Sequence, residues 1–448
     1  MRFYPTAAAA QYAGFRACKR CRPDAVPGSP EWDARADLVA RAMRLISDGV
    51  VDREGVAGLA RRLSYTERHL HRLLVADVGA GPLALARARR AHTARLLIET
   101  TDLPITELAF AAGFTSIRQF NDTIREVFAV APRELRKSRG QSGESVRGEI
   151  SLHLPFRTPL DADSLLRFFG RRAVPGVEAF DGRTYRRTLR LPHGVGVVAL
   201  SDGGGHVRCV LRLENLRDLG TVVQRCRSLL DLDADPVAVS DVLGGDRIIG
   251  DLVRRSPGRR VPGSVDGTEL ATRAVLGQQV SVAGARALAA RLVASCGEPL
   301  PEALADDELT HLFPEPDAVV EATREDLAVP EARFESLRTL ARALAGGGIA
   351  LDPGSDREEA GRCLLEIRGI GTWTASYIAM RALGDPDAFL PTDLGVRRAI
   401  SRLAGDQASV VALAERWRPW RAYATQHLWA SLEDVARTVD KTKREVVA

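Results

Sequence analysis

The sequence predicts a mainly α-helical protein with one small α+β layer. Hydrophobic residues recur with a helical period up to about residue 137 and again from about residue 240, whereas between them they alternate with a period of two. A chain of 448 residues, 45% of them hydrophobic, exceeds what one core usually organises, so we expect two to four domains. The sequence has neither a run of eighteen apolar residues nor a signal-peptide pattern. We therefore expect a cytoplasmic protein that does not contact membranes.

Composition divides the chain into five segments. We expect a segment with a cysteine pair at 1–30, a double helix-turn-helix domain at 31–137, a linker at 138–147, a small antiparallel sheet with helices at 148–240 and a helical domain at 241–448. The linker is polar and rich in Gly and Ser. Residues 1–140 hold 23 basic and 15 acidic side chains, whereas the remainder holds 40 and 43. This excess of positive charge favours a nucleic-acid contact in the N-terminal part.

A repeat of about fifty residues lies within the predicted double helix-turn-helix domain. Leu59–Leu70 aligns with Leu108–Phe120, and each copy predicts a short helix, a tight turn at Ser64 or Gly113, and a second helix opened by a Thr or Ser cap. In this geometry the first residues of the second helix face base edges in a major groove. The predicted base-contacting residues are Thr66, Glu67, Arg68 and His71 in the first copy and Ser116, Arg118, Gln119 and Asn121 in the second. The alternative is an ordinary helical bundle.

The second copy also carries a family resemblance. The segment Ile105–Leu135, with Gly113-Phe114 and a Pro-Arg-Glu-Leu run at its end, resembles the AraC-type regulators, which carry two such motifs about fifty residues apart. The resemblance covers about 40–137. It implies sequence-specific binding to promoter DNA and contact with RNA polymerase.

Cys18 and Cys21 form a Cys-x-x-Cys pair, which can supply half of a tetrahedral zinc site. The stretch around them, Ala13–Pro23, resembles the end of the zinc domain of the Ada-type alkylation-response proteins. That family has two further cysteines upstream, one of which accepts a methyl group. We expect zinc at Cys18 and Cys21 only if those cysteines precede Met1. A regulator that switches by accepting a methyl group, another alternative for the function, needs the same missing residues.

Residues 148–240 have the pattern of a structural support. Period-two runs predict strands at 150–156, 185–191, 195–200 and 207–213, and helices are expected at about 161–170 and 216–232. We identify no group of side chains in this layer that points to chemistry.

A sharp helix-to-helix junction stands out in the C-terminal domain. An amphipathic run meets Gly369-Ile370-Gly371, and a second helix begins at Thr372, which is the pattern of a helix–hairpin–helix. The glycines permit a tight turn, and the free N–H groups of the second helix can bind a DNA phosphate. About twenty residues later Asp393 opens another helix, whose N–H groups and dipole would keep its carboxylate ionised. The alternative for Asp393 is ordinary helix N-capping.

Aromatic residues accompany this aspartate. Trp373 and Tyr377 are four residues apart and so share one face of the second hairpin helix, and Trp429 comes from a later helix. Two of the five tryptophans near one carboxylate favour a stacking cleft for a flat, electron-poor ring, where cation–π attraction adds about 0.5–2 kcal/mol. Packing in the hydrophobic core is the alternative for each ring.

Over residues 148–435 the sequence resembles the AlkA-type 3-methyladenine DNA glycosylases of the helix–hairpin–helix superfamily. The matching stretches are Leu276–Ala283, the hairpin, Phe389–Asp393 and Glu415–Tyr423. The resemblance implies a catalytic Asp393, a base pocket of Trp373, Tyr377, Trp429 and Leu394, a wedge into DNA at Gln279 with Gln278, backbone contacts at Gly369, Ile370, Gly371 and Thr372, and a monovalent cation held by the carbonyls of Leu365, Ile367 and Ile370. Gln279 replaces an apolar wedge and Leu394 an aromatic residue, so we expect an altered base preference.

The resemblance implies that duplex DNA with alkylated purines is the substrate. A flipped, positively charged base would be held by aromatic faces while Asp393 stabilises the oxocarbenium ion and assists water, without a cofactor. Relatives that also cleave the sugar use a lysine amine, but Trp373 stands in its place and no lysine occurs from 138 to 440. This indicates a monofunctional hydrolase. No cysteine follows Cys363, which excludes a four-cysteine iron–sulfur cluster. The alternative is a transcription regulator with a catalytically inactive glycosylase-like domain.

Overall fold

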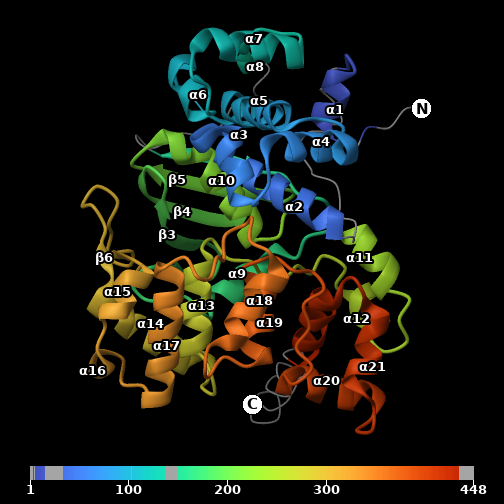
Figure 1. The fold of residues 1–448 in the computed structure, drawn as a ribbon, viewed down its shortest axis with the longest axis vertical. Coiled ribbons are helices and arrows are strands. Elements are labelled where there is room, and N and C mark those ends of the chain that lie inside the picture. Colours follow the sequence, from blue (N-terminus) through green and yellow to red (C-terminus); the bar gives the residue numbers. More distant parts are fainter. Residues whose placement is uncertain (1–3, 5, 16–33, 102, 138–148, 433–448) are drawn as a thin grey trace, which may run out of the picture.

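The computed structural model describes residues 4, 6–15, 34–101, 103–137 and 149–432 of the chain (Figure 1). One group of helices forms one end of the molecule, a small sheet lies next to it, and a larger group of helices forms the other end (Figure 1). This arrangement confirms the predicted fold class of a mainly α-helical chain with one small antiparallel sheet. None of the helices in the described ranges combines the length and the hydropathy that a bilayer span requires.

The N-terminal helices carry both predicted helix-turn-helix motifs. They are α1 (Ala7–Tyr12), α2 (Ala34–Ser47), α3 (Val50–Arg62), α4 (Glu67–Val78), α5 (Pro82–Thr100), α6 (Ile105–Ala111), α7 (Ile117–Phe128) and α8 (Pro132–Lys137). The turns before α4 and α7 lie at Ser64 and Gly113, whose φ angles of 61° and 86° fall in the left-handed region. Thr66 and Ser116 then cap α4 and α7, because each side chain accepts a hydrogen bond from the backbone N–H three residues later.

Within the described residues, five strands form one antiparallel sheet in the order β1-β5-β4-β3-β2. The strands are β1 (Ile150–Leu154), β2 (Glu178–Phe180), β3 (Tyr185–Leu191), β4 (Gly194–Asp202) and β5 (Val207–Leu213), accompanied by α9 (Ala162–Gly170), η1 (Leu216–Asp218) and α10 (Leu219–Leu229). Strand β2 was not predicted, because three residues are too few to show a period. The strand predicted to reach Phe156 ends at Leu154, because Pro155 has no N–H to donate to a neighbouring strand.

One hydrophobic cluster joins this sheet to the second helix-turn-helix motif. Its buried members include Leu97 of α5, Leu108 of α6, Phe120 of α7, Leu152 of β1 and Leu211 of β5. Buried residues of α9 and α10 belong to the same cluster. The second helix-turn-helix motif is therefore packed against the sheet that follows it in the chain.

The C-terminal part is helical around two further clusters of buried residues. Its elements are α11 (Pro236–Leu243), α12 (Gly250–Arg255), α13 (Gly267–Leu276), α14 (Val282–Cys296), α15 (Pro316–Glu321), α16 (Arg324–Leu327), α17 (Glu331–Ala345), α18 (Arg357–Glu366), α19 (Thr372–Arg381), α20 (Leu394–Ala404), α21 (Val410–Ala414) and η2 (Glu415–Trp417), a helix over residues 421–432, and the short pair β6 (Glu298–Pro299) and β7 (His311–Leu312). Helices α18 and α19 flank the predicted hairpin.

Helix α2 contacts the loop that leads into α18. Arg41 donates to the carbonyl of Gly354 (2.7 Å) and to the carboxylate of Asp356 (3.1 Å), and Arg44 donates to the carbonyl of Pro353 (2.5 Å). Asp356 in turn caps α18 through two backbone N–H groups. The first helix of the hairpin is therefore tied at its N-terminus to α2.

A buried ion network joins the sheet to α13. Arg187 of β3 pairs with Glu269 of α13 (2.6 Å), and Arg273 of α13 pairs with Glu178 of β2 (2.9 Å). Burial acts to raise the pKa of Glu178, but the guanidiniums of Arg273 and Arg187 hold it below its usual value. Arg273 also donates to the carbonyl of Arg172 (2.7 Å), so the network reaches the end of α9.

Candidate active site

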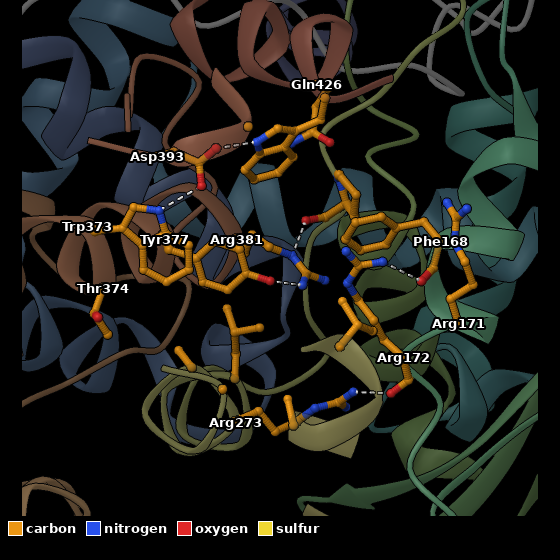
Figure 2. A pocket seen from close by; sticks show the side chains of 18 of the residues that line it. Phe168, Arg171, Arg172, Arg273, Trp373, Thr374, Tyr377, Arg381, Asp393 and Gln426 are labelled. Atoms are coloured by element: carbon orange, nitrogen blue, oxygen red, sulfur yellow. Dashed lines mark hydrogen bonds between the residues drawn. The ribbon is translucent and has the colours of Figure 1, made fainter. Parts of the chain in front are cut away.

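Asp393 caps α20 and faces two tryptophans (Figure 2). Its Oδ1 accepts hydrogen bonds from the backbone N–H of Val396 (2.8 Å) and the indole N–H of Trp429 (2.8 Å), and its Oδ2 accepts one from the indole N–H of Trp373 (2.9 Å). Three donors hold the carboxylate in one orientation and offset part of its charge. Helix capping accounts for the contact with Val396 and leaves the two indole contacts unexplained.

The hairpin turn sets the position of Trp373. Gly369 has a φ of 92°, and a Cβ at this position would lie 2.1 Å from Oγ of Ser336, so the turn requires glycine. The Ser336 hydroxyl donates to the carbonyl of Arg368 (2.7 Å), which fixes the turn against α17. Gly371 and Thr372 are exposed where α19 begins, so the N–H groups of its first turn are open to an anion.

A cavity of about 840 Å³ opens beside Asp393. All four residues predicted for a base pocket line it: Trp373, Tyr377, Trp429 and Leu394. Trp373 and Tyr377 stack with their ring centroids 5.2 Å apart and their planes inclined by only 7°, so they line the cavity as one stacked pair. Leu394 is 67% exposed and therefore borders the open side of the cavity.

The facing wall comes from α9. Phe168, Arg171 and Arg172 line the cavity across from the hairpin helix (Figure 2). The expectation that this layer is only a structural support is therefore wrong. Leu165 and Phe169 of α9 are buried in the cluster that the helix shares with the sheet, and the C-terminal end of α9 borders the cavity. The sequence signal was weak, since two arginines after an amphipathic run are common at a helix end.

Positive charge is built into the inner part of the cavity. Arg381 donates to the hydroxyl of Tyr377 (2.7 Å) and to two backbone carbonyls (2.9 Å each). Its guanidinium lies 5.0 Å from the ring centroid of Phe168, and that of Arg172 lies 3.8 Å from it. Burial acts to raise the pKa of Tyr377, but the guanidiniums of Arg381, Arg172 and Arg273 hold it below its usual value. Protein cations thus already occupy positions beside these aromatic rings.

The two glutamines predicted as a wedge differ in position. Gln279 is exposed at the edge of the cavity, with a φ of 55°, in the turn after α13. The Nε2 of Gln278 donates to the carbonyl of Gly369 (2.9 Å) and to Oγ1 of Thr374 (3.0 Å). Gln278 therefore ties the loop to the hairpin, and its part in the wedge stays a prediction.

The carbonyls predicted to hold a monovalent cation lie at the end of α18 and in the hairpin. Leu365 belongs to the last turn of α18, where carbonyls lack donors from within the helix. The carbonyl of Ile367 accepts the N–H of Ile370 (3.0 Å), which leaves its second lone pair for another partner. A set of carbonyl oxygens suits such a cation by its chemistry. Cys18 and Cys21 lie outside the described residues.

The predicted base-contacting residues of the helix-turn-helix motifs face solvent. The exposed ones are Thr66, Glu67, Arg68, His71, Ser116, Arg118 and Gln119, and Asn121 is half-buried. The side chain of Arg118 is 92% exposed. The opposite sides of α4 and α7 are buried through Leu70 and Leu74 and through Phe120 and Ile124. The polar side of each second helix is thus available to a major groove.

Four family models match the chain. They are the metal binding domain of Ada at residues 1–24, a helix-turn-helix domain at 59–138, the AlkA N-terminal domain at 151–266 and the HhH-GPD superfamily base excision DNA repair proteins at 272–421. A probable bifunctional transcriptional activator/DNA repair enzyme AlkA from Mycobacterium tuberculosis is 53% identical over 97% of this chain and 88% of its own length. DNA-3-methyladenine glycosylase 2 of Escherichia coli is 35% identical over 62% of this chain and 95% of its own length.

Solved structures share the fold of the C-terminal part. A 3-methyladenine DNA glycosylase from Archaeoglobus fulgidus, 24% identical, superposes with a TM-score of 0.52 and covers 62% of this chain and 96% of its own. The family models and the 53% identical relative confirm the resemblances that the sequence motifs predicted for both halves of the chain.

Proposed function

Because the chain belongs to the AlkA family of bifunctional transcriptional activators and DNA repair enzymes, we propose that it excises alkylated purines of the 3-methyladenine type from duplex DNA and binds promoter DNA through its helix-turn-helix motifs. One observation carries the repair function. The carboxylate of Asp393 is fixed by two indole N–H groups at the side of an aromatic cavity.

The cavity would receive a base that has rotated out of the duplex. An enzyme that acts on a base must take it out of the stack, and the stacked pair of Trp373 and Tyr377 offers an aromatic face for it. The N–H groups at the start of α19 would hold a phosphate of the same strand. Gln279, exposed at the edge of the cavity, would fill the gap that the base leaves.

Asp393 would act on the sugar. An N-alkylated purine nucleotide carries positive charge on the base, so the electron pair of the breaking C1′–N bond neutralises the leaving purine without a general acid. The sugar becomes an oxocarbenium ion, which the fixed carboxylate stabilises. Water then attacks C1′ and loses a proton to Asp393. The indole donors keep the carboxylate aimed at the sugar while this charge develops.

We further propose that the enzyme is a monofunctional hydrolase that requires no cofactor. A lyase needs an amine to form a Schiff base with the sugar. None of the residues that line the described cavity is a lysine, and Trp373 stands at the start of the second hairpin helix where such relatives carry one. A monovalent cation on the carbonyls of Leu365, Ile367 and Ile370 would strengthen the phosphate contact without taking part in bond cleavage.

The N-terminal half would act as the regulator. Helices α4 and α7 each present a polar, exposed side that fits a major groove, with Arg68 and Arg118 as the strongest candidates for base or phosphate contacts. We propose RNA polymerase as the further partner of promoter-bound protein, and the cytoplasm as the place where both activities occur.

Release of free bases from methylated duplex DNA tests the proposal. The purified protein should release 3-methyladenine, measured by chromatography, and leave the DNA strand intact until alkali cleaves the abasic site. Tight DNA binding without base release would instead support the alternative of a regulator with an inactive glycosylase-like domain. Strand cleavage without alkali would contradict the monofunctional assignment.

A further inference from the structure

Gln426 is a polar residue inside the cavity that the proposed mechanism does not use. It belongs to the helix over residues 421–432, lines the cavity and is only 6% exposed. Its Nε2 makes a long contact with the sulfur of Met380 (3.8 Å), and within the described residues its amide oxygen has no hydrogen-bond partner. The amide borders the open space of the cavity, so a ligand bound there can complete its hydrogen bonds.

The helix places Gln426 in the same cavity as the carboxylate of Asp393. Gln426 and Trp429 are three residues apart and share a helix face, with a rise of about 4.5 Å between them. Trp429 reaches Asp393, whereas Gln426 reaches Met380, which lies eight residues into α19 and about 12 Å from its start. Figure 2 shows the carboxamide directed into the cavity, on the side of Asp393. A base whose sugar lies at Asp393 can therefore present an edge to Gln426.

Charge alone gives the cavity little selectivity among bases. The guanidiniums of Arg381 and Arg172 lie beside the aromatic rings and repel a cationic purine, so they offset the attraction that bare aromatic faces would supply. Hydrogen bonds to the base edge then decide which bases are held well. Arg381 donates hydrogen bonds to Tyr377 and to two backbone carbonyls, whereas the amide of Gln426 is available to hydrogen bond with a base.

We propose that Gln426 determines base specificity by hydrogen bonding to the Watson–Crick edge of the flipped purine. This inference rests on the proposed glycosylase function. A carboxamide carries a donor and an acceptor side by side, and half a turn about its last bond exchanges them. It can therefore pair with N1 and the N6 amino group of an adenine, or with O6 and N1–H of a guanine. Gln426 would let one cavity accept alkylated adenine and alkylated guanine.

Two substitutions separate this role from packing. Glu in place of Gln offers only acceptors. These suit 3-methylguanine, whose N1–H and N2 amino group are adjacent donors, better than 3-methyladenine, whose N1 is itself an acceptor. We expect Gln426→Glu to raise the ratio of the 3-methylguanine to the 3-methyladenine release rate about tenfold. Gln426→Met keeps the volume and removes both hydrogen bonds, so both rates should fall about tenfold with the ratio unchanged. One methylated duplex carries both bases, so a single chromatogram gives the ratio. Thermal melting reports whether each variant is folded.

Matched changes at Gln224, which lies on α10 outside the cavity and contacts Ser228 (3.5 Å), serve as controls and should leave both rates unchanged. Wild-type rates in a folded Gln426→Met variant would overturn the proposal. Equal losses for both bases in Gln426→Glu and Gln426→Met would also overturn it, because packing alone would then explain the residue. Failure of the wild-type protein to release either base would overturn the glycosylase function itself, and this inference with it.

Discussion

Asp393→Asn removes the negative charge of the site while keeping nearly all of its shape. The amide oxygen can still accept from the N–H of Val396 and from Trp429, and Asn caps helices as well as Asp does, so we expect α20 to remain folded. The new NH2 group would face the indole N–H of Trp373, a donor that now lies 2.9 Å from Oδ2. Two donors repel each other, so Trp373 loses its partner and the carboxamide is no longer held on both sides.

The lost charge sets the size of the effect. Two unit charges about 4 Å apart interact by about 4 kcal/mol at an effective dielectric constant of about 20, and this attraction to the oxocarbenium ion disappears with the carboxylate. A barrier higher by about 4 kcal/mol slows the reaction about a thousandfold. The assay is single-turnover release of 3-methyladenine with enzyme in excess, together with fluorescence anisotropy of a duplex that carries an abasic-site analogue.

The control is Asp266→Asn, the same change at the cap of α13, where the side chain accepts two backbone N–H groups. We expect it to keep both rate and affinity. If Asp393→Asn releases 3-methyladenine within tenfold of the wild-type rate, the carboxylate does not stabilise the transition state. If its affinity for DNA falls as far as its rate, the residue serves binding and the mechanism is wrong.

Three further changes test separate parts of the molecule. Trp373→Phe keeps a ring but removes one donor to the carboxylate of Asp393, so base release should slow at least tenfold. Its control, Trp417→Phe, should not slow base release, because the buried indole N–H of Trp417 has no partner in the described residues. Glu178→Gln breaks a buried network and should lower the free energy of unfolding by about 3–5 kcal/mol near pH 7. Two guanidiniums hold the pKa of this carboxyl below its usual value, so the carboxylate stabilises the fold above about pH 4.5 and this stabilisation is lost as the pH falls. The melting temperature of the variant should therefore depend less on pH at the acid end. An unchanged dependence would contradict the direction of the pKa shift. Arg118→Ala should weaken binding to promoter DNA. If the side chain contacts a phosphate, the slope of log K against log salt should fall by about one. If it contacts a base, the preference for the promoter sequence should fall and the salt slope should stay the same.

Local sequence signals were enough for most of the fold. The two helix-turn-helix motifs, the hairpin and the cap at Asp393 each depend on a few neighbouring residues, such as Gly113 for a left-handed turn and Ser116 for a cap. Strand β2 was missed because it is three residues long and pairs on only one side. Contacts between residues close in the sequence can therefore be predicted, whereas short irregular elements cannot.

Only part of the cavity could be predicted from the sequence. The spacing of Trp373 and Tyr377 predicted their common face, because a helix brings residues i and i+4 together. Nothing in the spacing brings Phe168 and Arg172 to the same cavity, since they are about two hundred residues away from these rings and reach them only through the packing of α9 on the sheet. The hydrogen bonds of Gln278 could not be predicted either, because its partners Gly369 and Thr374 lie about ninety residues further along the chain.

The regulator and the repair domain are joined by more than a linker. Helix α7, which would read promoter DNA, buries its apolar side in the cluster that also holds residues of α9, and α9 forms a wall of the cavity. On the other side, Arg41 of α2 contacts the cap of α18, and α18 is a single helix of ten residues, about 15 Å long, that ends at the hairpin (Figure 1). The N-terminal helices therefore contact both the sheet layer that lines the cavity and the helix that leads into the hairpin.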